Sequence, residues 1–254
     1  MQLPQLGDVT VPVVAAAVVL ACGLGLVAGV VADGPVTALG GLLRADALTA
    51  WMLLTVGAVA VTALWGGTPH AQDRPASQGH FGTLLCAFLF AMTLALVADN
   101  LGLMWVAIEA TTITTAFLVG YRGTRGALEA AWKYVVLGSV GVAIAFLGVV
   151  LVFAASRATG EPTLSWLALV EHAHHLDAPL VKVGGALAAL GFATKAGLAP
   201  MHSWLPDAHS QAPAPVSGLM SGVLLAVAFY AILRVQAITD AALGPELMLS
   251  LIHI

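Results

Sequence analysis

Two ionisable side chains, Glu109 and Lys195, lie inside long apolar stretches of the sequence. An ionised group at bilayer depth costs about 2.5–3.5 kcal/mol on insertion scales, so such groups tend to be paired and functional. Desolvation disfavours the charged form of either group, which suits both to taking up and releasing protons. We interpret the two residues as candidates for proton transfer within a membrane. The competing interpretations are a protonated, hydrogen-bonded Glu109 and a Lys195 that reaches the membrane interface.

The residues that follow Lys195 interrupt the apolar pattern. The segment 200–215 carries four prolines and the polar residues His202, Asp207 and His209. Proline removes a backbone donor and breaks helices, and irregular backbone at membrane depth is tolerated where it is buried in protein or lines a water-filled cavity. We therefore expect an interrupted helix near residues 199–206. The two histidines titrate near neutral pH and are candidate proton relays, with a loop at the membrane surface as the alternative.

Glu129 and Lys133 are spaced i to i+4 where another apolar run begins. Glu ahead of Lys at that spacing pairs on one helical face. We interpret Glu129 as half of an ion pair near the interface. Lys133 lies deeper and is a candidate member of a polar chain.

No metal or cofactor site is expected in this chain. Cys22 and Cys86 lie in apolar runs and form no Cys-x-x-Cys pair, which argues against an iron–sulfur cluster. His172, His174 and His175 lack a correctly spaced acidic or cysteine ligand. No glycine-rich nucleotide loop follows a strand.

The composition indicates which elements must position these groups. Hydrophobic residues make up 60% of the 254 positions and charged residues 9%, against about 25% charged in soluble domains. The net charge is −4 and no basic tract appears, so nucleic acid is not an expected partner. A spanning helix needs about 20 mostly apolar residues, and we count seven candidate spans. They are Val11–Val31, Ala47–Trp65, Phe81–Ala98, Leu101–Gly120, Ala130–Ala154, Leu180–Ala199 and Val216–Val235.

The predicted fold is therefore all-α, a polytopic transmembrane helix bundle with one discontinuous helix. Such a chain lies in the lipid bilayer as a multi-pass protein. Glu109 and Lys195 should face the same interior, because neither is tolerated against lipid. We expect their charged tips to interact directly or through one water.

The last six residues, Leu249–Ile254, are those that a common transposon-adapter sequence encodes in this reading frame. We therefore expect residues 1–248 to form the transmembrane proton-translocating domain, cut short at its C-terminal end. Residues 249–254 are interpreted as derived from the adapter. A genomic stop codon directly after Ile254 would contradict this interpretation.

The segment from Lys195 to Gly222 resembles the signature of the antiporter-like membrane subunits of complex I. It reads Lys-x4-Pro-x-His-x-Trp-Leu-Pro-Asp-Ala-His-x2-Ala-Pro-x-Pro-Val-Ser-x3-Ser-Gly. That family includes chains L, M and N of complex I, membrane subunits of group 4 hydrogenases, and cation/proton antiporter subunits. The runs Ile108–Thr112 and Leu128–Tyr134 are most similar to hydrogenase-4 component F, and the run beginning at Asp46 resembles the start of an early family helix.

The resemblance implies an antiporter-like fold, of which this chain holds the first repeat in truncated form. Glu109 matches the family's mid-membrane glutamate, and Lys195 matches the lysine of its broken helix. The family pairs these groups to drive proton transfer, and His202 and Asp207 match its signature loop. One departure is Ala226, where many members carry a second lysine. Another is that one helix rather than two precedes the Asp-Ala-Leu element.

The expected function is translocation of protons or sodium by a subunit of a respiratory or hydrogenase-type oxidoreductase complex, with no redox site of its own. Its expected partners are other membrane subunits and the hydrophilic subunits of the redox arm, in the inner (plasma) membrane of the cell. The alternatives are a cation/proton antiporter subunit without a redox partner and a structural membrane anchor.

Overall fold

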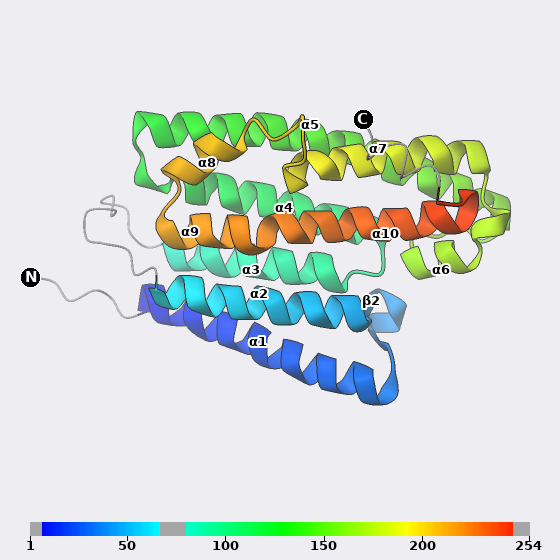
Figure 1. Cartoon of the computed structure of the whole chain (residues 1–254), viewed down its shortest axis with the longest axis horizontal. Coiled ribbons are helices and arrows are strands. Elements are labelled where there is room, and N and C mark those ends of the chain that lie inside the picture. Colours follow the sequence, from blue (N-terminus) through cyan, green and yellow to red (C-terminus); the bar gives the residue numbers. More distant parts are fainter. Residues whose placement is uncertain (1–6, 67–79, 246–254) are drawn as a thin grey trace, which may run out of the picture.

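All seven predicted spans form helices in the computed structural model, which describes residues 7–66 and 80–245. The helices run back and forth between two ends of an elongated bundle (Figure 1). They are α1 (Gly7–Asp33), α2 (Ala47–Gly66), α3 (Phe81–Val97), α4 (Leu101–Val119), α5 (Arg125–Ser156), α7 (Ala178–Ala196), and α9 (Ala214–Leu219) continued by α10 (Leu225–Leu243). The all-α prediction is confirmed, and residues 249–254 lie outside the described part of the chain.

Five of these helical stretches are long and apolar enough to cross a membrane: α1, α2, α4, α5 and the continuous stretch Ala214–Leu243. Helix α3 is apolar but has only 17 residues. Helix α7 carries two lysines, Lys182 and Lys195, and is not among the five. Large apolar side chains such as Phe90, Phe117 and Trp132 are exposed on the outside of the bundle, as expected for a surface that faces lipid.

Short elements connect the long helices. Strands β1 (Val36–Ala38) and β2 (Leu43–Ala45) form an antiparallel hairpin between α1 and α2, with Val36 opposite Ala45. The connector between α5 and α7 contains α6 (Trp166–Glu171). Ser165 caps the start of this helix, because its hydroxyl accepts a hydrogen bond from the Ala168 N–H at 3.2 Å. The hairpin was not predicted, because its strands are only three residues long.

The predicted interruption of the sixth span is confirmed. Helix α7 ends at Ala196, and Gly197 takes a left-handed conformation with φ of 70°, which favours glycine. The N–H of Leu198 then bonds to the carbonyl of Ala193 at 3.0 Å, which closes the helix end. The chain resumes as α8 (Leu205–Gln211), with Pro206 in its first turn, where a missing N–H costs nothing.

A second break separates α8 from α9, at Ala212 and Pro213. The chain then continues through a π-helical turn, Met220–Leu224, into α10. Such single π turns interrupt the regular hydrogen-bond ladder of a helix. The seventh span is therefore one long but irregular helix.

Helices α5 and α7 pack closely because glycines line their interface. A Cβ added at Gly141 of α5 would lie 2.5 Å from the Cβ of Thr194 on α7. Helices α1 and α2 meet in the same way, since a Cβ at Gly23 would lie 2.7 Å from the backbone N of Leu54. Small residues let the backbones of two helices come this close, and in lipid it is such packing, rather than the hydrophobic effect, that drives helices to associate. The α5–α7 contact brings the side chains of α5 against the end of α7.

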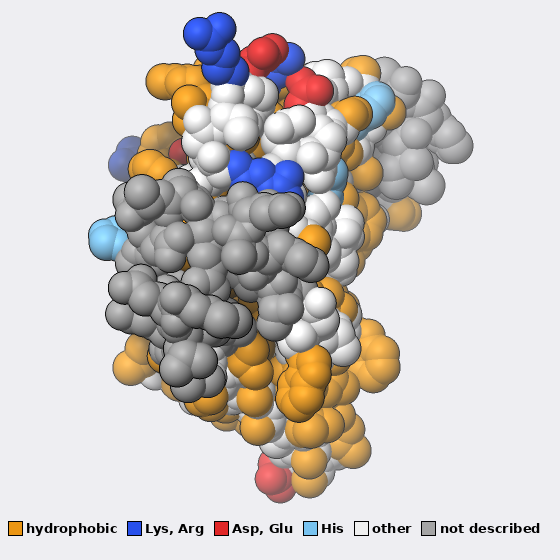
Figure 2. Space-filling model, turned by 90° about the vertical axis from the view of Figure 1, so that its left-hand side faces the viewer, with side chains coloured by type: hydrophobic (Ala, Val, Ile, Leu, Met, Phe, Trp, Pro, Cys, Tyr) orange, Lys and Arg blue, Asp and Glu red, His pale blue; other side chains and the backbone are white. Residues whose placement is uncertain are grey.

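The end of the bundle that carries the start of α5 and the start of α9 is shown in Figure 2. Lys, Arg, Asp and Glu side chains gather toward the top of this face, and hydrophobic side chains dominate its lower part. Charged groups thus cluster at a bundle end, where membrane helices meet water.

Candidate functional site

Lys195 lies in the last turn of α7 and is 1% exposed. Its ammonium donates one hydrogen bond to the Thr112 hydroxyl at 2.9 Å and another to the Tyr134 hydroxyl. The ammonium nitrogen also lies 4.5 Å from the centroid of the Tyr134 ring, within range of a cation–π interaction. Lys195 therefore does not reach out to the membrane interface; its charge is held inside the bundle.

Glu109 lies on α4 and is half-buried. Its Oε2 accepts a hydrogen bond from the Thr112 hydroxyl at 3.3 Å, and its Oε1 accepts one from the Ser139 hydroxyl at 3.3 Å. Thr112 follows Glu109 by three positions, so both project from one face of α4. The carboxylate is thus oriented by two hydroxyls, one from its own helix and one from α5.

The Thr112 hydroxyl connects the two ionisable groups. It accepts from the ammonium of Lys195 and is placed to donate to the carboxylate of Glu109. The expectation that Glu109 and Lys195 share one interior is confirmed. Among the described residues they are linked through the buried Thr112 side chain rather than by a direct ion pair. A hydroxyl can accept one hydrogen bond and donate another at the same time, so a single threonine can connect an ammonium to a carboxylate.

Lys133 and Asp207 form a separate group on the outside of the bundle. The ammonium of Lys133 lies 2.8 Å from Glu129 Oε1 and 2.9 Å from Asp207 Oδ2. These side chains are 49%, 67% and 46% exposed, in the order Lys133, Glu129, Asp207. The predicted i to i+4 pair is therefore formed. Lys133 also joins α5 to α8 through Asp207, and its ammonium contacts these two carboxylates on the outside of the bundle.

The two histidines of the interrupted segment are not brought to Lys195. His202 is exposed, and its carbonyl accepts from the Leu205 N–H at 3.0 Å. His209 is half-buried, and its Nδ1 lies 3.1 Å from the Ser217 hydroxyl of α9. The sequence-predicted residues thus divide into a buried pair, an exposed ionic group and two separate histidines.

The sequence interpretation did not identify Thr112, Ser139 and Tyr134 as parts of the site. Their only signal in the sequence is a hydroxyl near an ionisable residue, or at helical spacing from one. That signal is weak, because hydroxyl side chains in apolar helices often bond to the backbone of their own helix. Thr111, beside Thr112, illustrates this, because its hydroxyl donates to its own helix at the carbonyl of Ile108, at 2.6 Å.

An ion pair between the buried Arg234 and the partly buried Asp46 was also missed. Arg234 on α10 donates to Asp46 Oδ1 at 2.6 Å and to the Thr49 hydroxyl at 3.2 Å. Its guanidinium carbon lies 4.1 Å from the centroid of the Trp166 ring and 4.7 Å from that of Tyr230. Burial alone would raise the pKa of the Asp46 carboxyl, but hydrogen bonds from Arg234 and from the backbone of Thr49 hold it below its usual range. This pair ties the start of α2 to α10.

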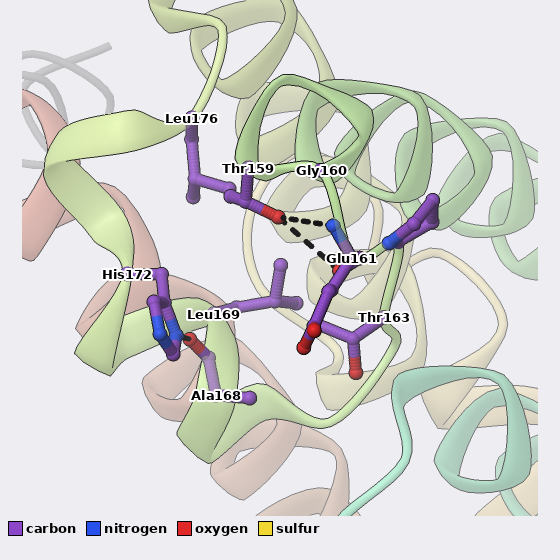
Figure 3. Close-up of a pocket in the computed structure, with 9 residues that line it drawn as sticks. Thr159, Gly160, Glu161, Thr163, Ala168, Leu169, His172 and Leu176 are labelled. Atoms are coloured by element: carbon purple, nitrogen blue, oxygen red, sulfur yellow. Dashed lines mark hydrogen bonds between the residues drawn. The ribbon is translucent and has the colours of Figure 1, made fainter.

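A hollow of about 800 Å³ lies at the end of the bundle where α5 ends (Figure 3). The Thr159 hydroxyl and the His172 ring already contact neighbouring backbone. The Thr159 hydroxyl bonds to the N–H of Glu161 at 3.3 Å, and the His172 ring lies 2.9 Å from the Ala168 carbonyl, as the dashed lines in Figure 3 show.

Comparison with known proteins identifies the family to which the chain is similar. The family described as NADH:quinone oxidoreductase/Mrp antiporter, transmembrane region, matches residues 98–254. A hydrogenase-4 component F homolog of Methylacidiphilum infernorum is 45% identical over 170 residues, which cover 66% of this chain and 36% of that protein. Subunit N of the NADH-quinone oxidoreductase of Myxococcus xanthus is 33% identical over 186 residues, covering 72% of this chain and 35% of that protein.

A solved structure supports the same fold. A chain of the membrane-bound sulfane sulfur reductase, an archaeal respiratory membrane complex, superposes with a TM-score of 0.83 at 24% identity. The match covers 94% of this chain and 50% of that one. The chain described here spans about a third of the two sequence relatives and half of the structural one.

Proposed function

The chain belongs to the NADH:quinone oxidoreductase/Mrp antiporter transmembrane family, and we propose that it translocates protons as a membrane subunit of a hydrogenase-type or respiratory oxidoreductase complex. It is a multi-pass membrane protein built of apolar helices. The proposed location is the inner (plasma) membrane. The electron-transfer chemistry would reside in hydrophilic partner subunits, and this chain would hold no redox centre of its own.

The observation that carries the proposal is the Lys195–Thr112–Glu109 hydrogen-bond chain. A proton passes along it when the Lys195 ammonium gives a proton to the Thr112 oxygen while the Thr112 hydroxyl gives its own proton to Glu109. The ammonium becomes an amine, the carboxylate becomes a carboxylic acid, and the threonine is unchanged apart from rotation of its hydroxyl. No other reactant is needed, since every proton released is taken up within the chain.

Electrostatics make this step sensitive to geometry. The attraction between an ammonium and a carboxylate stabilises the state in which both are charged, and burial destabilises it. Moving Lys195 away from Glu109 removes the attraction and leaves the burial cost, so the ammonium then tends to release its proton. Small displacements of the end of α7 can therefore control transfer.

A hydrogenase-linked complex is the proposed context, because the relative with 45% identity is a hydrogenase-4 component F homolog. The second candidate is a cation/proton antiporter subunit without redox partners, which the Mrp members of the family favour. Genes for a nickel–iron hydrogenase beside this one would support the first, and their replacement by antiporter genes would support the second.

The test is proton uptake into inverted membrane vesicles that carry the assembled complex, measured beside electron transfer to an artificial acceptor. Glu109→Gln and Lys195→Ala should abolish or strongly reduce proton uptake and leave the artificial-acceptor activity intact. Lys182→Ala and Glu171→Gln serve as controls, because they remove exposed charges of the same types, one of them on the same helix. Unchanged uptake in both site variants would overturn the proposal and favour a structural anchor.

A further inference from the structure

Trp204 lies in the segment that interrupts the sixth span, and it is 1% exposed. Its indole N–H donates to the carbonyl of Thr194 at 2.9 Å. Thr194 is the residue before Lys195, in the last turn of α7, and its carbonyl also accepts from the Gly197 N–H at 3.3 Å. The interrupting segment thus folds back and fixes the helix end that carries the lysine.

The same indole packs against Tyr134. The two ring centroids are 4.9 Å apart and the rings meet at 67°, an edge-to-face arrangement. Such aromatic pairs contribute about 0.5–1.5 kcal/mol beyond their burial. Tyr134 is fully buried, so its ring has little freedom to move while Trp204 is in place.

Tyr134 in turn contacts Lys195 in two ways. Its hydroxyl accepts a hydrogen bond from the ammonium, and its ring centroid lies 4.5 Å from the ammonium nitrogen. A lysine ammonium has three donors, and here one is directed to Tyr134 and one to Thr112. The tyrosine therefore fixes the direction in which the ammonium faces the Thr112 hydroxyl.

An exposed contact reinforces this arrangement. Asp207, three residues after Trp204, pairs with Lys133, the residue before Tyr134. The segment that follows the break therefore contacts one turn of α5 twice, through a buried aromatic pair and through an exposed ion pair.

We propose that Tyr134 is a positioning residue for Lys195 and that Trp204 positions Tyr134, so that the segment interrupting the helix sets the place of the ammonium. This rests on the proposed proton transfer from Lys195. When Trp204 stays packed, the ammonium is held toward Thr112. When the segment shifts, Tyr134 is released and Lys195 loses both its acceptor and its ring contact.

The test uses four variants of the assembled complex in vesicles: Tyr134→Phe, Trp204→Ala, Trp204→Phe and Lys195→Ala. Tyr134→Phe keeps the ring and removes the acceptor, so proton uptake per electron transferred should fall roughly tenfold or more, the effect of losing a hydrogen bond to a charged group. Trp204→Ala should lower uptake to a similar degree. Trp204→Phe should retain a large part of the proton uptake, because phenylalanine keeps the edge-to-face contact with Tyr134. If the indole N–H mattered only for structure, Trp204→Phe would lose as much uptake as Trp204→Ala.

Tyr121→Phe and Trp105→Phe are the matched controls. Tyr121 packs against Phe81, Trp105 packs against Phe146 and donates to the Val142 carbonyl, and the hydrogen bonds of the Lys195 ammonium go to Thr112 and Tyr134 instead. Both should keep normal uptake. Artificial-acceptor activity and the amount of assembled complex show whether each variant has folded. If Trp204→Ala does not assemble, Tyr134→Phe and Trp204→Phe still test the positioning role.

The outcomes separate the two proposals. Normal uptake in Tyr134→Phe, with loss in Lys195→Ala, overturns the positioning role and leaves the proton-transfer function standing. Normal uptake in Lys195→Ala overturns the proton-transfer function itself, and the positioning role falls with it.

Discussion

Lys195 and Thr112 are joined across the bundle: the lysine ammonium donates to the threonine hydroxyl at 2.9 Å, although the two residues are 83 positions apart in the chain. Because the same hydroxyl is placed to donate to Glu109, one uncharged side chain completes the path between two ionisable ones. In the proposed proton transfer, this threonine is therefore as necessary as the two groups that carry the charge.

Thr112→Val tests this directly, because valine keeps the shape of threonine and removes its hydroxyl. A hydrogen bond to a charged group contributes about 1.5–3 kcal/mol, so the proton-uptake rate should fall roughly ten- to hundredfold. Thr112→Ser should retain most of the uptake. Thr111→Val is the control, since that hydroxyl bonds only to its own helix, and uptake there should be normal. Equal rates for the two valine variants would contradict the bridging role.

The exposed Lys133–Asp207 pair should matter less than Lys195. Exposed ion pairs contribute about 0.2–1 kcal/mol, and this pair has no hydrogen bond to the buried chain. Lys133→Gln and Asp207→Asn should therefore lower proton uptake by a few-fold at most, measured in vesicles beside Lys195→Ala. A loss as large as that of Lys195→Ala would place Lys133 on the proton path.

The Asp46–Arg234 pair should contribute strongly to stability. Removing one partner of a buried pair leaves the other charge unpaired, at a cost of about 3–5 kcal/mol. Arg234→Gln and Asp46→Asn should each lower the thermal unfolding temperature of the detergent-solubilised complex. The double variant should lose less than the sum of the two single ones. Additive losses would show that the two side chains do not act as a pair.

Gly141→Ala should loosen the contact that brings α5 to Lys195. The added Cβ would lie 2.5 Å from the Cβ of Thr194, and overpacking of this kind typically costs about 1–3 kcal/mol. Both the unfolding temperature and proton uptake should fall. Gly29→Ala on α1 is the matched control, because a Cβ there meets nothing within 4 Å. A neutral or slightly stabilising effect is expected for it, since alanine favours helix more than glycine does.

Much of the fold could be predicted because it depends on local features. The seven helical spans follow from the length and apolar character of each run, and the break after α7 follows from the prolines beyond it. The hairpin of β1 and β2 could not be predicted in this way, because strands of three residues leave no readable alternation.

The candidate site was only partly predictable, for a different reason. Glu109 and Lys195 are conspicuous because a charge in an apolar run is rare. Their partners are not conspicuous, since a threonine or tyrosine in such a run costs little and needs no explanation. Lys133 is a different case: the sequence makes it a candidate member of a polar chain, and the structure places its side chain in an exposed ion pair with Asp207.

The sequence by itself determined that this is a membrane helix bundle with two ionisable groups at depth and one interrupted helix. Each of these follows from the water-to-lipid transfer cost of single residues and from backbone rules that act over a few positions. Only the tertiary structure decided that Thr112 joins Lys195 to Glu109, that Tyr134 and Trp204 hold the lysine, and that Arg234 meets Asp46. These contacts connect helices whose residues lie tens to hundreds of positions apart, and the faces that meet are set by how closely the glycine-lined helices can pack.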